Sequence, residues 1–242
     1  MEGKNTKFVH NNIIYGKHAV LLACNNRNIE DITRILLTEK SSINLIPKHL
    51  HNKVEIHTLK ALNNISHNHN GFICYTKPIR TINERELKNM QNILALDCVQ
   101  DVGNIGAILR TAAAFNVEAI IYTTDKMPDI SQNATVSKLS SGGIELVKLC
   151  CVTNLSRTLE NLKKENFWII GTDAKGQEIS KIKKQYENSK KVLVLGNEET
   201  GIRPNIWKIC DAFASIKINQ QIESLNVSVA GGIVMWELFG EK

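Results

Sequence analysis

From residue 92 onward, short apolar runs alternate with helix-forming stretches, and this alternation limits the folds that the chain can adopt. Strands are expected at residues 93–99, 119–122, 167–171, 191–195 and 212–218. Helices are expected between and after them, over about 105–115, 155–164, 204–210 and 226–239. Strands that are apolar along their length are typical of a parallel sheet with both faces covered. The pattern therefore predicts an α/β domain over residues 92–242 with a buried parallel sheet.

The first part of the chain carries a second, smaller α/β pattern. A short strand and a helix over about 17–26 come first, and further strands are expected at residues 31–38, 55–59 and 71–75. Residues 77–91 contain a proline and many charged side chains, so they are interpreted as a linker with a helical part over 84–90. The sequence thus predicts a small α/β domain over residues 12–76.

Charge is divided unevenly between these two parts. Residues 1–90 hold 13 Lys and Arg against 7 Asp and Glu, whereas residues 91–242 hold 17 of each. The whole formal net charge of +6 therefore lies in the first part of the chain. Two interpretations stay open, a basic surface that meets a polyanion and a basic surface that is simply solvated.

Several features argue against other classes of protein. No apolar stretch approaches the ~18 residues of a membrane span, and the first residues do not resemble a signal peptide, so a cytoplasmic protein without a membrane partner is expected. The six cysteines form no C-x-x-C pair and are expected to be reduced and mostly buried. All seven histidines lie between His10 and His69. A histidine-dependent nucleophile or zinc site in residues 70–242 would need a group from elsewhere, and no metal site is expected.

A first glycine-bearing segment follows the strand at 93–99 and reads Asp101-Val-Gly-Asn-Ile-Gly-Ala-Ile-Leu-Arg110. Glycines there allow a sharp turn and leave room for a ligand. The spacing is not G-x-G-x-x-G, so a dinucleotide site is poorly supported. An ordinary strand-to-helix turn with Asn104 as the N-cap is the plain alternative. Arg110 would lie about one and a half turns into the helix, and its plain alternative is a surface salt bridge.

Two further segments follow later strands. Gly196-Asn-Glu-Glu-Thr-Gly201 comes after an apolar strand, at the edge where open α/β sheets bind ligands. Its Glu198 could hold a ribose or an amine, or the loop could be a solvated turn. Ser224-Leu-Asn226 opens the last helix, where Ser and Asn are natural caps. Gly231 and Gly232 each cost that helix about 1 kcal/mol, which indicates close packing against another backbone or a ligand.

In this order and spacing, the three segments resemble the three motifs of the SpoU/TrmH family of RNA ribose 2′-O-methyltransferases. More loosely, Tyr15-Gly-Lys-His-Ala-Val and Asn70-Gly-Phe-Ile-Cys-Tyr resemble the substrate-binding domain of the family, which is similar to ribosomal-protein L30e folds. The resemblance implies S-adenosylmethionine (AdoMet) as cofactor, RNA rather than DNA as partner, and a deep C-terminal trefoil knot, a feature that is very rare in proteins. It also implies a homodimer through the knot region, with Gly231 and Gly232 in contact with the second copy.

The resemblance also implies roles for particular residues. The functional polar positions of the family fall on Asn104, Arg110, Glu198, Ser224 and Asn226. The cofactor is expected at Leu195, Gly196, Asn197, Ile216, Leu225 and Asn226. A ribose 2′-hydroxyl must lose its proton to accept the methyl group. The family picture often makes the motif-one arginine the base, but a guanidinium stays protonated near neutral pH. Either Arg110 holds an RNA phosphate that takes the proton, or it stabilises the 2′-alkoxide, which is the preferred hypothesis.

Three positions depart from the family pattern. Glu199 stands where glycine is common, and it would be strained in a left-handed conformation. Lys217 and Gln220 stand where proline and glycine are common, which bears on loop shape and substrate choice. The separate first domain favours a guanosine of 23S ribosomal RNA as substrate. A transfer RNA ribose and a non-catalytic RNA-binding assembly factor are the alternatives, and the intact polar positions argue against the latter.

Overall fold

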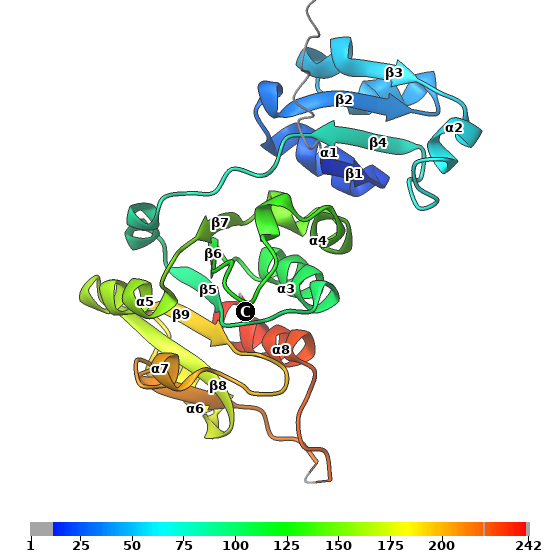
Figure 1. Cartoon of the computed structure of the whole chain (residues 1–242). Helices are drawn as coiled ribbons and strands as arrows, with labels where there is room; N and C mark the ends of the chain where they lie inside the picture. The colour runs from blue at the N-terminus through cyan, green and yellow to red at the C-terminus, as the bar shows by residue number, and fades with distance from the viewer. Residues whose placement is uncertain (1–11, 220, 241–242) are drawn as a thin grey trace, which may run out of the picture. The chain divides into compact units, whose positions relative to one another are not determined.

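A computed structural model describes residues 12–219 and 221–240, which divide into two compact units (Figure 1). The first contains the described residues up to Ile79 together with Gln132–Ala134. The second contains Arg80–Ser131 and the described residues from Thr135 onward. Gln220 lies outside the described residues, so its expected effect on the loop stays a prediction.

The first unit is a four-stranded sheet in the order β1-β4-β2-β3. Its strands are β1 Asn12–Tyr15, β2 Ile32–Leu37, β3 Val54–Ile56 and β4 Phe72–Thr76. Its helices are α1 Lys17–Asn26 and α2 Leu59–Asn63, with short 3₁₀ turns at Ile29–Asp31, Lys40–Leu45 and Lys48–Lys53. Apolar side chains of α1, such as Val20, pack with those of the sheet, such as Ile35, in one core. The predicted strands and first helix are confirmed, whereas the short α2 was not predicted.

The second unit is a six-stranded, fully parallel sheet in the order β10-β8-β9-β5-β6-β7. Its strands are β5 Asn92–Leu96, β6 Ala119–Tyr122, β7 Lys148–Cys151, β8 Phe167–Glu178, β9 Lys190–Leu195 and β10 Ala212–Ser215. Its helices are α3 Val102–Ala114, α4 Ala134–Leu139, α5 Leu155–Lys164, α6 Ile179–Gln185, α7 Pro204–Trp207 and α8 Val227–Phe239. Further 3₁₀ turns lie at Glu84–Asn89, Ile130–Gln132 and Gly143–Glu145. The buried parallel sheet is thus confirmed.

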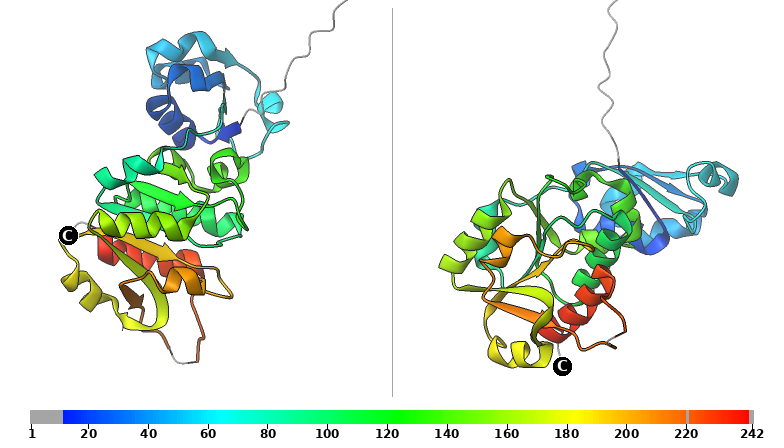
Figure 2. Two further views of the ribbon diagram at one scale, coloured as in Figure 1. Left: turned by 60° about the vertical axis from the view of Figure 1, so that its left-hand side comes forward. Right: turned by 60° about the horizontal axis from the view of Figure 1, so that its bottom comes forward.

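Helices cover both faces of the parallel sheet (Figures 1 and 2). The helices α3 and α8 pack against each other on one face, while α5 and α7 lie together on the other. A Cβ at Gly231 would lie 2.6 Å from Leu195 Cδ1, and one at Gly232 would lie 3.5 Å from Thr111 Cγ2. Side chains of the same chain lie nearest to both glycines, and a contact of the pair with a ligand or with a second copy stays a prediction.

Several sequence predictions need correction in the second unit. The helices α4 and α6 were not predicted, and β5, β10 and α7 end before their predicted ends at 99, 218 and 210. The strand β7 was missed because only its two central residues, Leu149 and Cys150, are buried. The strand β8 runs on to Glu178, beyond the predicted end, because its polar second half pairs with β10 after a register shift. The helix α3 begins at Val102 and not at 105, since the Asp101 side chain caps it.

The cysteines and the buried histidine take part in packing and in local hydrogen bonding. All six cysteines are free, and four of them are buried, as predicted. Burial raises the pKa of both Cys150 and Cys210 to about 12, so these thiols are protonated at neutral pH. The buried His69 joins a turn, with its Nε2 2.9 Å from Asn63 Oδ1 and its Nδ1 accepting from Gly71 N at 2.8 Å. In the described part of the chain, no helix is both long and apolar enough to cross a membrane.

Candidate active site

A cavity of about 450 Å³ lies where three distant chain segments meet beside the parallel sheet. The loop after β9, Gly196–Gly201, forms one wall. The connection from β10 to α8 forms another, with Ile216, Ile218, Glu223, Ser224 and Leu225. The third wall is Thr172, Asp173 and Ala174 of β8, and residues of α8 close the cavity. The β8 residues were missed because they lie beyond the predicted end of that strand.

The loop after β9 is folded tightly on Asn197. The Asn197 side-chain oxygen accepts from the backbone N–H groups of Glu199 and Thr200 at 3.0 and 3.1 Å. Asn197 and Gly201 exchange backbone hydrogen bonds, and Gly201 takes a φ of 69°. The left-handed position that favours glycine is therefore Gly201, and Glu199 is not among the described residues with positive φ. The strain foreseen for a carboxylate at 199 does not arise.

A buried ion pair anchors the far end of this loop. Asp97 is fully buried after β5, and its carboxylate accepts from Arg203 N at 2.8 Å and from Arg203 Nε at 2.6 Å. The Asp97 N–H donates to Leu195 O at 2.8 Å, and Asn197 Nδ2 donates to Cys98 O at 3.0 Å. Sequence reasoning missed this pair. The sequence feature that could have indicated the pair is Asp97, the only charged side chain in the apolar run 93–99.

Two asparagines and a glutamate form a hydrogen-bonded chain between the motifs. Asn226 Nδ2 donates to Asn104 Oδ1 at 3.0 Å, and Asn104 Nδ2 donates to Glu198 Oε1 at 2.8 Å. The Asn226 side-chain oxygen also caps α8 by accepting from Ser228 N at 2.9 Å, as predicted for this residue. A carboxylate only accepts, so the amide of Asn104 has one orientation that satisfies both neighbours. The chain therefore holds all three side chains in place.

The prediction of Asn104 as an N-cap is wrong. Asp101 is the cap, and its Oδ1 accepts from Asn104 N at 2.7 Å. Asn104 lies within the first turn of α3, so its side chain does not cap the helix. It donates a hydrogen bond to Glu198 instead.

Arg110 lies apart from the cavity of its own chain. It is exposed on α3 and does not line the cavity. Its guanidinium makes no hydrogen bond or ion pair within the described part of the chain, so the interpretation as a surface salt bridge is wrong.

The structure brings together most of the residues singled out from the sequence. Those that line the cavity are Gly196, Asn197, Glu198, Ile216, Ser224 and Leu225. Asn104 and Asn226 do not line it but reach Glu198 through their hydrogen bonds. Leu195 is fully buried behind it. Roles in binding or catalysis stay predictions for all of these residues.

The cavity is strongly acidic. Four carboxylates line it, from Asp173, Glu198, Glu199 and Glu223, and no lysine, arginine or histidine of residues 12–219 and 221–240 does. Apolar side chains of Ile216, Leu225 and Val234 face the same space. A ligand that combines positive charge with an apolar ring system suits such a lining.

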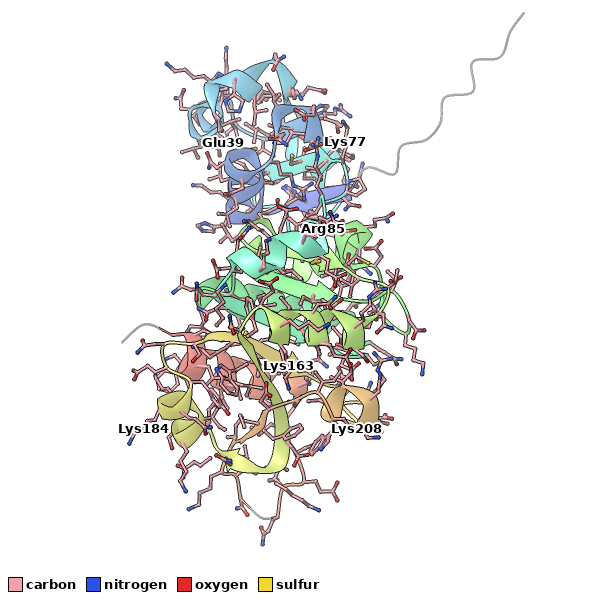
Figure 3. All side chains as sticks on the ribbon, turned by 90° about the vertical axis from the view of Figure 1, so that its left-hand side faces the viewer. Glu39, Lys77, Arg85, Lys163, Lys184 and Lys208 are labelled. Atoms are coloured by element: carbon pink, nitrogen blue, oxygen red, sulfur yellow. The ribbon has the colours of Figure 1, made fainter. Side chains whose placement is uncertain are left out.

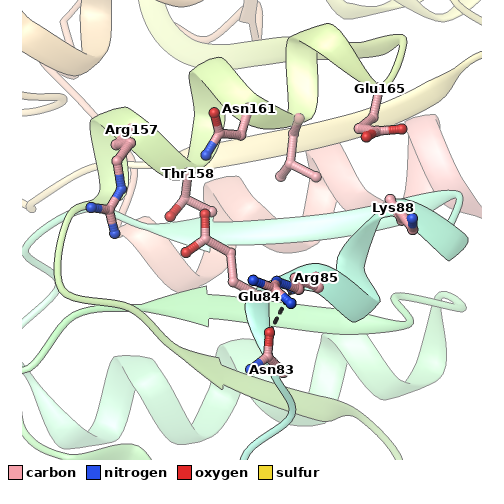
Figure 4. A pocket seen from close by; sticks show the side chains of 9 residues that line it. Asn83, Glu84, Arg85, Lys88, Arg157, Thr158, Asn161 and Glu165 are labelled. Carbon is pink, nitrogen blue, oxygen red and sulfur yellow. Dashed lines mark hydrogen bonds between the residues drawn. The ribbon is translucent and has the colours of Figure 1, made fainter.

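A second cleft, of about 420 Å³, lies between α5 and the 3₁₀ turn at Glu84–Asn89 (Figure 4). Its basic side chains, Arg85, Lys88 and Arg157, are exposed. The hydrogen bond drawn there, from Arg85 N to Asn83 Oδ1 at 3.0 Å, belongs to the cap of the 3₁₀ turn. This cleft contains no residue of the three sequence motifs.

Comparison with known proteins places the chain among RNA-modifying enzymes. Residues 91–236 match the model of the SpoU rRNA Methylase family, and residues 13–82 match the model for RNA 2′-O ribose methyltransferase substrate binding. The 23S rRNA (guanosine-2′-O-)-methyltransferase RlmB of Vibrio vulnificus is 34% identical, over 96% of this chain and 98% of its own length. The RlmB of Escherichia coli is 38% identical over 72% of each chain.

The solved structures agree in fold. The AdoMet-bound rRNA methyltransferase from Sinorhizobium meliloti superposes with a TM-score of 0.77, at 21% identity, over 95% of this chain and 87% of that one. The two family models together span both units, and the cavity lies within the segment that the first model matches. The chain belongs to the SpoU rRNA methylase family.

Proposed function

We propose that this protein transfers the methyl group of AdoMet to a ribose 2′-hydroxyl of RNA, with a guanosine of 23S ribosomal RNA as its substrate. The observation that carries this proposal is the acidic cavity beside the hydrogen-bonded chain Asn226–Asn104–Glu198. The names of the curated relatives support the substrate, because RlmB enzymes act on guanosine of 23S rRNA.

The lining of the cavity fits AdoMet. AdoMet carries a positive sulfonium and an ammonium group, and four carboxylates surround the space. Ile216, Leu225 and Val234 offer an apolar surface for the adenine ring, and Gly196 lines the same space. When bound, AdoMet supplies an electrophilic methyl group to which a ribose 2′-oxygen can bond as the carbon–sulfur bond breaks.

The polar residues Glu198, Arg110 and Ser224 have separate roles. Glu198, oriented by Asn104, accepts hydrogen bonds from a ribose hydroxyl or an amine at the cavity mouth. An adjacent phosphate of the RNA takes the proton of the 2′-hydroxyl, and the guanidinium of Arg110, a positively charged group, stabilises the 2′-alkoxide that forms, in the manner of an oxyanion hole. Ser224 supplies a further hydroxyl at the cavity wall.

Because Arg110 does not line the cavity of its own chain, we propose that a second copy supplies it. The side chains of Val229, Ile233 and Trp236 follow each other at helical spacing on α8 and are 51%, 37% and 59% exposed. Helix α3, which carries Arg110, packs directly against α8. A homodimer through this surface would bury the apolar stripe and bring Arg110 towards the other copy.

Replacing Trp236 with glutamate is expected to convert the dimer to a monomer, because a charge would then be buried within the apolar stripe. Light scattering coupled to size-exclusion chromatography measures the change. AdoMet binding should persist while turnover is lost. The matched control is Trp168→Glu, at a tryptophan that is 42% exposed on β8 and outside the stripe. A W236E protein that stays dimeric would remove this surface from the interface.

Three finer features belong to the same proposal. The segment from β10 through α8 forms the deep trefoil knot, which the meeting of three distant segments around one cavity supports. The domain bounds are 12–76 for the first domain, 77–91 for the linker and 92–242 for the methyltransferase domain. The first domain takes an L30e-like fold and holds the RNA, and its excess of basic residues supports this role. A ribosomal RNA substrate would place the protein in the cytoplasm.

Incubation with labelled AdoMet and unmodified 23S rRNA or transfer RNA, followed by digestion to nucleosides, tests the function. Label in 2′-O-methylguanosine from 23S rRNA is the expected result. Label from transfer RNA alone would replace the proposed substrate. A protein that binds AdoMet and labels neither RNA would contradict both, and one that does not bind AdoMet would favour the non-catalytic alternative.

A further inference from the structure

A cleft of about 680 Å³ adjoins the proposed cofactor cavity. It lies between the β8 residues Asp173–Gln177 and a wall formed by Trp207 and Asp211–Phe213. Asp173 and Ala174 line both spaces, so the second half of β8 is a wall that they share. The size falls within the ~300–1,000 Å³ typical of ligand pockets. None of the three sequence motifs contributes to this cleft.

An aromatic stack forms its floor. The rings of Trp207 and Phe213 are stacked, with centroids 3.7 Å apart and planes inclined by 21°. Phe213 is held firmly, since a Cβ at Gly171 would lie 2.7 Å from its ring. Trp207 remains 39% exposed although one face is covered by Phe213. The other side of the indole is therefore open, and it rests on a fixed support.

The charges around the stack favour a strand of nucleic acid with its phosphates outside. Lys208, next to Trp207 in the chain, is exposed on the face that Figure 3 presents, and Lys175 is exposed on β8. Neither ammonium group makes an ion pair or hydrogen bond within the described residues. One of the two acids of the cleft is neutralised, since Asp211 pairs with Lys163 at 2.6 Å. Asp173 Oδ1 accepts from the backbone Lys175 N at 2.7 Å and keeps its charge.

We propose that this cleft binds one unpaired nucleotide of the RNA substrate, with its base stacked on Trp207 and its phosphate beside Lys175 and Lys208. The inference rests on the proposed function and adds a subsite to it. Every base has a π-face, so stacking accepts any sequence but requires a base that is free of a helix. The shared β8 wall would fix this nucleotide close to the site of methyl transfer.

The Trp207→Leu variant tests the stack and keeps an apolar side chain over Phe213. Stacking of a base on an aromatic side chain is worth about tenfold or more in affinity. We expect the KM for RNA to rise about tenfold, while kcat and the Kd for AdoMet stay close to wild type. Trp168→Leu is the matched control, because this tryptophan is 42% exposed and lines none of these cavities. An unchanged KM for RNA in W207L would overturn the proposal.

A binding assay without turnover separates this inference from the proposed function. The chain has three tryptophans, so replacing Trp168 and Trp236 by phenylalanine leaves Trp207 as the only indole. Single-stranded RNA oligonucleotides should quench its fluorescence, and a duplex of the same sequence should not. Equal quenching by both, or none by either, would overturn the subsite even if methylation is observed. Quenching in this variant, together with no methylation of any RNA by the wild-type protein, would instead contradict the proposed function.

Lysine variants guard against misfolding of the tryptophan variant. Lys208→Ala should weaken single-stranded RNA binding and lower the salt dependence of that binding by about one phosphate contact. Lys184→Ala, at an exposed lysine on α6, is the control and should do neither (Figure 3). Equal effects of the two substitutions would indicate non-specific charge attraction and overturn the role of Lys208.

Discussion

Replacing Arg110 with alanine is expected to lower kcat by about 10²–10³, the loss seen when one donor to a developing oxyanion is removed. The fold should be unaffected, because the guanidinium is exposed and has no partner within the described residues. Alanine also maintains the helix, since it has the highest helix propensity. The Kd for AdoMet should not change, because Arg110 does not line the cavity. Single-turnover methylation and calorimetric AdoMet binding measure the two effects.

Two comparisons sharpen this test. Arg157→Ala is the matched control, at an exposed arginine on α5 whose guanidinium also has no partner among the described residues, and it should retain full turnover. Arg110→Lys keeps the charge but loses the planar fork of the guanidinium, so partial recovery is expected if charge stabilisation is the role. Near-normal turnover in R110A would exclude Arg110 from the mechanism.

Replacing Gly196 with alanine is expected to abolish AdoMet binding. A Cβ there would lie 2.4 Å from Gly201 C and 2.5 Å from Ile202 N, which are backbone atoms that cannot rotate away. The turn held by Asn197 would have to open, and overpacking of this kind costs about 1–3 kcal/mol. Because Gly196–Gly201 forms a wall of the cavity, the displaced loop removes part of the site. Calorimetry measures the binding, and thermal unfolding measures the loss of stability.

Gly232→Ala provides the contrast. Its Cβ would meet Thr111 Cγ2 at 3.5 Å, an ordinary contact, and the helix would gain about 1 kcal/mol from the loss of an interior glycine. AdoMet binding should be normal and stability slightly higher. If G196A binds AdoMet as tightly as G232A does, the loop after β9 is not part of the cofactor site.

The sequence was sufficient for the parallel sheet because its central strands are apolar on both faces. In β9, for example, Val192–Leu195 is wholly buried, and such runs are recognisable without a structure. Strand β8 shows the limit of this reasoning. Its second half is polar and becomes a strand only by pairing with β10, which is a long-range contact that no local pattern encodes.

The sequence predicted many residues of the candidate site, but not the hydrogen bonds and the ion pair that join them. Six of the predicted site residues line the cavity, yet the capping role went to Asp101 because its carboxylate competes successfully for the first free N–H groups of α3. The Asp97–Arg203 pair joins residues on different segments, and the sequence gives no measure of that distance. For the same reason, the sequence did not predict that residues of β8 line the cavity.

The chain of side-chain amides between Asn226, Asn104 and Glu198 has a thermodynamic consequence. Glu198 faces the cavity, while the two asparagines belong to the first turn of α3 and the cap of α8. A ligand that shifts Glu198 changes the hydrogen bonding of both helices, so the free energies of binding cofactor and RNA are linked. Linkage is reciprocal: whatever factor RNA imposes on the affinity for AdoMet, AdoMet imposes on the affinity for RNA. Cofactor occupancy would then control which state of the protein engages RNA.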